Sequence, residues 1–112
     1  TTAGLHPRGD RAFTPGVGDY RVIPGNCAAD ELVMSHVSSN FDRTGFQEDL
    51  NVVFPIDRLH ELVEHRDIGS LASFHYSFMG GGTHSAWMRE SALKVIEFLR
   101  GDHVNTVLLV PV

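Results

Sequence analysis

Apolar residues at positions 106–112 form a nearly continuous hydrophobic run near the end of the chain. The run, TVLLVPV, is rich in Val and Leu and is too short for a globular helix. Such a run is typical of a strand that is covered on both faces in the middle of a parallel sheet. We therefore predict that residues 106–112 are a central strand.

Three other segments have patterns that favour strands. Residues 19–23 combine Tyr, Val and Ile and end in a Pro-Gly turn, and residues 31–37 form a second short extended segment. Residues 73–79 alternate large and small side chains and stop abruptly at three glycines. The alternation and the turn residues predict strands in all three places.

Two segments have apolar residues at helical spacing. Residues 51–63 carry the stripe Ile56, Leu59, Leu62 and Val63, and Pro55 suits a first helical turn. Residues 85–100 carry a second stripe and are followed by Gly101, a typical helix stop. The members of this second stripe are Met88, Ala92, Val95, Ile96 and Leu99.

Residues 1–18 and 38–50 have the composition of loops. The first segment contains several Gly and Pro residues, so we expect it to bury little, with His6 in solvent. The alternation of strands and helices predicts a single α/β domain over residues 1–112, incomplete at both ends. We expect a Rossmann-like or flavodoxin-like layered fold with a mainly parallel sheet.

Composition excludes several classes of function. Fourteen acidic and nine basic residues give a net charge of −5, and no basic cluster is present, which argues against nucleic acid. No apolar run approaches the length of a membrane span. The single cysteine, Cys27, indicates a reducing cytoplasm and has no obvious adjacent base. The seven histidines contain no His-x-x-x-His pair, so we expect no metal site.

Strand-end geometry predicts where a site would lie. Ligands bind beyond the carboxyl ends of strands in open α/β sheets, so Gly80 to Gly82, Ser35-His36 and Val112 should share one edge. The three glycines suit either close approach of a ligand or a plain flexible turn, and they match no nucleotide-binding motif. On position alone, a ring hydrogen-bonded to the backbone is a better interpretation of His36 than a functional one.

Two motifs together resemble one protein family. Residues 54–62 (FPIDRLHEL) and 78–82 (FMGGG), with the opening residues 1–6 (TTAGLH) and Ser35-His36, resemble the selenoprotein B family of glycine, sarcosine, betaine and D-proline reductases. The two central motifs look closest to those of the selenocysteine subunits of D-proline reductases. The likeness covers nearly the whole chain.

The resemblance implies an oxidoreductase activity of a longer, oligomeric, cytoplasmic protein, of which this chain is a truncated N-terminal part. The redox residue, selenocysteine or cysteine, is expected just after Val112, and the chain itself holds no cofactor. A pyruvoyl group on a partner subunit would hold a small amino-acid or betaine substrate, whose C–N bond is cleaved reductively. A non-catalytic binding or assembly module of the same fold is the alternative.

The resemblance also assigns candidate site residues. His36 and His75 are candidate catalytic residues that would donate or accept a proton. The candidates for binding a substrate carboxylate or an adjoining loop are Asp57, Arg58, Gly80, Gly81 and Gly82. For Asp57 and Arg58 a helix-start cap with an ion pair is an equally good interpretation. The chain departs from the family at residues 64–67 (EHRD), where glycine is usual, and it lacks the strand that usually precedes the opening motif.

Overall fold

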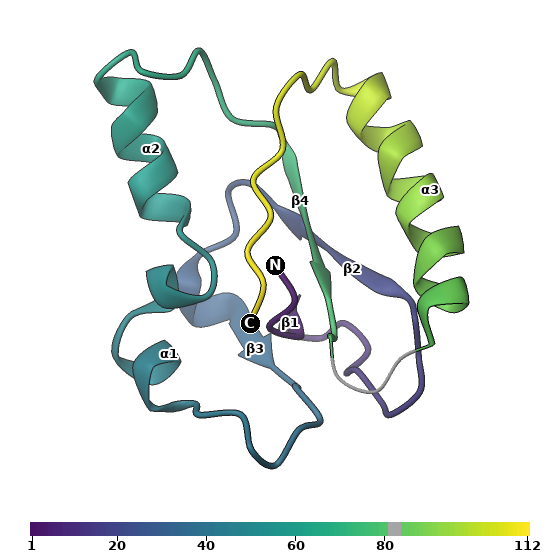
Figure 1. Ribbon diagram of the computed structural model, residues 1–112. Coiled ribbons are helices and arrows are strands. Elements are labelled where there is room, and N and C mark those ends of the chain that lie inside the picture. The colour runs from purple at the N-terminus through teal and green to yellow at the C-terminus, as the bar shows by residue number, and fades with distance from the viewer. Residues whose placement is uncertain (81–83) are drawn as a thin grey trace.

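The computed structural model describes residues 1–80 and 84–112 (Figure 1). Within these residues, four strands form two antiparallel pairs, which overturns the predicted layered fold with a mainly parallel sheet. Strand β1 (Leu5–Pro7) pairs with β3 (Leu32–Met34), and β2 (Tyr20–Pro24) pairs with β4 (Phe74–Phe78). An isolated antiparallel bridge between Ala3 and Met79 links the N-terminal segment to the end of β4.

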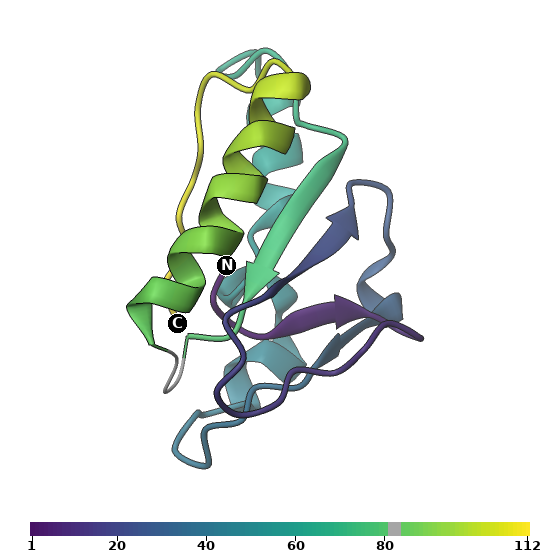
Figure 2. The same cartoon turned by 90° about the vertical axis from the view of Figure 1, so that its right-hand side faces the viewer.

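Three α-helices accompany the strands: α1 (Thr44–Glu48), α2 (Ile56–Glu64) and α3 (Ser85–Gly101). Two 3₁₀ turns, Ala29–Glu31 and Leu50–Val52, precede β3 and α2. Helices α2 and α3 lie on opposite sides of β4 (Figures 1 and 2). The predicted helix at 85–100 is confirmed, whereas α1 lies in a segment that was predicted to be a loop.

Helix α2 begins later than the pattern predicts. The predicted helix starts at residue 51, but residues 50–52 form a 3₁₀ turn and α2 starts at Ile56. Pro55 precedes α2 and has no N–H to donate, so a continuous helix through it would lose a hydrogen bond. The side chain of Asn51 instead accepts a hydrogen bond from the backbone N–H of Asp57 at 3.0 Å, close to the start of the helix.

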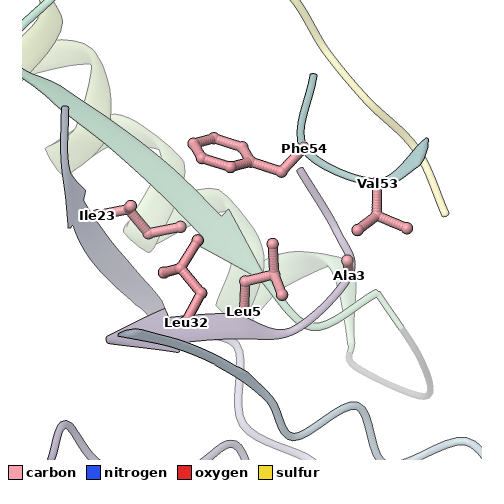
Figure 3. Packing of buried hydrophobic residues seen from close by; sticks show 6 residues of the cluster. All are labelled: Ala3, Leu5, Ile23, Leu32, Val53 and Phe54. Carbon is pink, nitrogen blue, oxygen red and sulfur yellow. The ribbon is translucent and has the colours of Figure 1, made fainter. Parts of the chain in front are cut away.

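The N-terminal segment is central to the core, so the prediction of a loop that buries little is wrong. Ala3 and Leu5 are fully buried and His6 is 5% exposed, which also contradicts the predicted solvated His6. The backbone N–H of Leu5 donates to Ser77 Oγ at 2.9 Å, and that of Gly4 donates to the Phe78 carbonyl at 2.9 Å. Figure 3 shows the cluster that results, which consists of Ala3, Leu5, Ile23, Leu32, Val53 and Phe54.

Residues 106–112 do not form the predicted central strand. Val107 is 54% exposed and Leu109 is 80% exposed, so neither side chain is covered as that prediction requires. The segment is extended beside the N-terminus, where the Thr2 N–H donates to the Val110 carbonyl at 3.1 Å (Figure 1). The run is apolar, but the exposure of Val107 and Leu109 shows that it is not covered on both faces as a buried strand would be.

The two longer helices also bury less than their stripes predict. No residue of α2 is buried, and Val95 is the one buried residue of the described helix α3. Helix α3 is held against the β2–β4 pair by aromatic contacts, because the Phe98 ring stacks on Tyr76 at 6.4 Å between centroids. Tyr20 approaches the same Phe98 ring edge-on at 6.5 Å.

Candidate functional site

Thr2 connects two segments that the sequence places at one site. Its Oγ1 accepts a hydrogen bond from the Val112 N–H at 2.8 Å, and its carbonyl accepts one from the Gly80 N–H at 3.3 Å. A Cβ at Gly80 would lie 3.2 Å from the Thr2 Cβ, which is a tight contact. Gly80 and Val112 therefore both bond to Thr2, while Gly81 and Gly82 lie outside the described residues.

Gly4 brings Ser35-His36 to the same segment. The Ser35 N–H donates to the Gly4 carbonyl at 3.0 Å. Gly4 has a φ of +67°, and a Cβ there would lie 3.2 Å from both the backbone N and the Cα of His36. A glycine is needed here because any side chain would be strained and would push against the His36 backbone. Ser35-His36 thus contacts the same N-terminal segment as Gly80 and Val112, although the predicted shared edge of a parallel sheet is absent from the described residues.

His36 is held tightly in this region. The side chain is 7% exposed, and its Nδ1 accepts a hydrogen bond from the Ser38 N–H at 3.2 Å. The Phe41 ring stacks on the imidazole with centroids 4.5 Å apart. Burial, and after it the positive charge of Arg43, lower the pKa of His36 below its ordinary value. The ring is therefore neutral near neutral pH, while its role in catalysis stays a prediction.

His75 has surroundings that differ from those of His36. It is on β4 next to the Phe54 ring, at 5.5 Å between centroids, and its Nε2 is buried with no hydrogen-bond partner among the described residues. Burial is the main cause that lowers the pKa of His75, followed by His60 and the N-terminal charge. His75 lines a cavity of about 300 Å³ that does not include His36 or Val112. Its catalytic role stays a prediction.

Asp57 and Arg58 make the contacts of a helix start. Asp57 Oδ2 accepts a hydrogen bond from the Asn51 side chain at 2.8 Å. Arg58 forms an ion pair of 2.8 Å with Glu61, and both side chains are largely exposed. These contacts match the cap and ion-pair interpretation of the two residues. Their role in binding a substrate or a loop stays a prediction.

Cys27 lies in a setting that disfavours a thiolate. It lines a cavity of about 340 Å³ with Arg8 and Glu31, among other residues. Burial, followed by the negative charge of Glu31, raises the pKa of the Cys27 thiol. A thiol needs a lowered pKa to be a good nucleophile at neutral pH, so the chemistry of Cys27 points away from catalysis.

Neither a metal centre nor a membrane span is found in the part of the chain that the structure describes. No three His, Cys, Asp or Glu side chains gather there in a way that would hold a metal ion. None of its helices is long and apolar enough to cross a membrane.

Sequence reasoning missed three residues that organise this region. Thr2 and Gly4 were noticed only as part of the opening motif, and nothing in the sequence indicated that they join Gly80, Val112 and His36. Arg43 was placed in a polar loop, yet its guanidinium binds the His36 carbonyl at 2.6 Å. The likeness of residues 1–6 to the family was the one available signal for this segment.

Comparisons with known proteins identify the family of the chain. Residues 18–112 match the family described as glycine/sarcosine/betaine reductase selenoprotein B (GRDB). The chain is 32% identical over 111 residues to the D-proline reductase subunit gamma of Acetoanaerobium sticklandii, which covers 97% of this chain and 45% of that protein. The chain thus spans a little under half the length of this relative. No solved structure matches the chain. The chain belongs to the glycine/sarcosine/betaine reductase selenoprotein B family.

Proposed function

We propose that this chain is the N-terminal part of a cytoplasmic reductase subunit whose redox residue, a selenocysteine or a cysteine, follows Val112. The observation that carries the proposal is the junction at Thr2. Thr2 holds Val112 beside Gly80. Gly4, which contacts the His36 backbone, follows Thr2 by two residues. A residue just after Val112 would therefore emerge beside Thr2 and Gly80, on the segment whose Gly4 contacts the buried His36.

The proposed reaction is reductive cleavage of a C–N bond in a small amino acid or betaine, within an oligomeric complex. One C–N bond breaks, the separated carbon and nitrogen atoms take up two electrons and two protons, and a dithiol is oxidised to a disulfide. A pyruvoyl group on a partner subunit supplies the electron withdrawal that activates the substrate amine. The attacking group is a selenolate or thiolate, which must be ionised to react.

The residues of this chain would shape the site and leave the redox step to the residue after Val112. Gly80 has no Cβ and so can pack closely against Thr2, because an added Cβ would lie 3.2 Å from the Thr2 Cβ. Its N–H already donates to Thr2, so Gly80 positions the chain and does not bind an anion through that N–H. Cys27 has no part in this proposed step. The pKa of its thiol is raised, and the cavity that it lines does not include Thr2.

The test starts from the coding sequence beyond Val112. A selenocysteine or cysteine is expected at or just after the next codon. The extended subunit, combined with its pyruvoyl partner, should oxidise a dithiol in the presence of D-proline, glycine, sarcosine or betaine. Replacement of the redox residue by Ala should abolish this turnover, while the matched Cys27→Ala control retains it.

Two results would overturn the proposal. If neither selenocysteine nor cysteine follows, and the extended subunit binds substrate without turnover, the chain is part of a non-catalytic binding module. If Cys27→Ala abolishes turnover instead, the nucleophile is wrongly assigned.

A further inference from the structure

The loop that follows β3 encloses the His36 imidazole on two sides. The Ser38 N–H donates to Nδ1 at 3.2 Å, which fixes the rotation of the ring about its Cβ–Cγ bond. The Phe41 ring covers one face, with an interplanar angle of 22° and centroids 4.5 Å apart. On the other side of the backbone, Gly4 approaches so closely that no Cβ would fit without a shift. The ring position is therefore determined by several independent contacts.

Arg43 ties this loop together from within. Its guanidinium donates to the carbonyl of His36 at 2.6 Å, and to those of Ser38 and Phe41 at 3.2 Å each. It also lies over the Phe41 ring at 5.8 Å from the centroid. No ion pair of Arg43 with a carboxylate is found within residues 1–80 and 84–112. The planar fork of an arginine suits such a set of carbonyl contacts better than the point charge of a lysine.

The hydrogen bond from Ser38 determines where the imidazole carries its proton. A ring nitrogen that accepts an N–H hydrogen bond has no proton of its own, so the neutral ring is protonated at Nε2. A proton added at Nδ1 would break the bond from Ser38 and would place a second positive charge near Arg43. Both effects, together with burial, act against the imidazolium form. The local geometry thus favours a neutral ring that donates through Nε2.

We propose that Arg43 is a positioning residue that keeps His36 in the neutral Nε2–H tautomer, so that His36 serves the reaction as a hydrogen-bond donor and not as a proton acceptor. The part of this proposal that concerns the reaction rests on the proposed function above. The part that concerns the tautomer stands on the contacts of the loop alone. A neutral donor of this kind suits an anionic group, such as a carboxylate, a thiolate or a selenolate, without itself gaining charge.

The tautomer is tested by NMR on the 112-residue chain with ¹⁵N-labelled histidine. Two-bond ¹H–¹⁵N couplings should identify the Nε2–H tautomer for His36, and a pH titration should give a pKa below the ordinary value. Arg43→Met should raise that pKa and mix the two tautomers, because the loop loses its carbonyl ties and its charge. Arg43→Lys keeps the charge but cannot reproduce the planar set of carbonyl contacts. The His36 pKa of this variant should therefore be closer to the wild-type value than its tautomer preference is.

A matched control separates these effects from general loss of an arginine. Arg58→Met removes an exposed arginine that forms an ion pair with Glu61, and should leave both His36 signals unchanged. Amide spectra show that each variant is folded, and Arg43→Lys provides the comparison if Arg43→Met does not fold. A wild-type Nδ1–H tautomer would overturn the proposal. Unchanged His36 signals in both Arg43 variants would also overturn it.

The donor role is tested in the active extended complex. His36→Gln keeps a side-chain N–H donor, whereas His36→Leu removes it. If His36 donates, the activity of the Gln variant should exceed that of the Leu variant by roughly tenfold or more. This is the factor expected for one hydrogen bond to a charged group. Equal loss in both variants would show that His36 acts as a proton acceptor. Absence of turnover in the unmutated complex would overturn the proposed function while leaving the tautomer result intact.

Discussion

Residues 1–7 and residues 106–112 run beside each other, but only the first segment is buried. Leu5 is fully buried although it stands among Gly, Pro and Thr, whereas Leu109 is 80% exposed within an apolar run. The difference lies in what each segment has on its two sides. Residues 1–7 lie between β4 and residues 106–112 and continue into the pair with β3, while residues 106–112 have the N-terminal segment on one side.

The comparison teaches that burial follows from position between partners more than from the hydrophobicity of a segment. The short N-terminal segment bonds to β3, to the end of β4, to Ser77 and to Val110. Its small residues allow these close approaches, because Ala3 and Gly4 leave room for neighbouring backbone. A segment without a second neighbour remains at the surface even when its residues are apolar.

The largest expected effect is at Leu5. Leu5→Ala would leave a cavity in the core and should lower the free energy of unfolding by about 3 kcal/mol. Urea unfolding followed by circular dichroism measures this loss. A loss below ~1 kcal/mol would mean that the segment is not the core element that its burial indicates.

The next effect is at Gly4. Gly4→Ala places a Cβ at positive φ and 3.2 Å from the His36 backbone, so we expect a loss of about 2 kcal/mol. Gly16→Ala is a matched control, because Gly16 has a φ of +77° but no atom within 4 Å of an added Cβ. The control carries the backbone strain alone, and the difference between the two variants reports the contact with His36. Equal losses would contradict that contact.

Acid should lower the free energy of unfolding through two histidines that are at least partly buried. His36 and His75 both have pKa values lowered from 6.5, chiefly by burial. The unfolded chain therefore binds protons at these residues at a higher pH than the folded chain, and stability falls as the pH drops below 6.5 toward the lowered pKa values. We expect this loss to be smaller than that of either substitution.

Urea midpoints between pH 7.5 and 5.0 measure the dependence. The double variant His36→Gln and His75→Gln should show a flatter profile over this range. The carboxyl groups of Asp42 and Asp49 have pKa values lowered from 3.8, so they titrate below the window. A profile that is equally steep in the double variant would assign the effect to other groups.

The smallest effect is expected in the apolar run. Leu109→Ala should change the free energy of unfolding by less than about 0.5 kcal/mol, because the side chain is already in solvent. The measurement is the same urea unfolding as for Leu5→Ala, on the 112-residue chain. A loss near that of Leu5→Ala would show that the two segments are equally buried and would remove the contrast between them.

Local patterns were enough to predict the elements that depend on local residues. Strands β2 and β4 and helix α3 lie where alternation, helical spacing and turn residues predicted them. Pairing was not predictable in this way. The partners of residues 3–5 lie about thirty and more than seventy positions away, at β3 and at Met79, and nothing in TTAGLH indicates them.

The grouping of the candidate site residues was predicted from a sheet that the structure does not have, and their role as a site stays a prediction. Gly80, Val112 and Ser35-His36 were expected together at the edge of a parallel sheet, which the structure does not have. They contact one segment because Thr2 bonds to Gly80 and Val112, and Gly4 bonds to Ser35. The roles of Thr2, Gly4 and Arg43 depend on single contacts between loops, and composition and periodicity carry no signal for those.

The bond between Thr2 and Val112 joins residues 110 positions apart, which has a consequence for the chain as it is synthesised. Ribosomes add roughly 5–20 residues per second, so the N-terminal segment waits on the order of ten seconds for its last partner. During about the first two thirds of that time Leu5 and Ala3 have no β4 to pack against, because β4 is complete only at Phe78. The bond between Thr2 and Val112 therefore forms only after the contacts of Thr2 with earlier residues are possible, and any segment that follows Val112 would leave the ribosome after that bond can form.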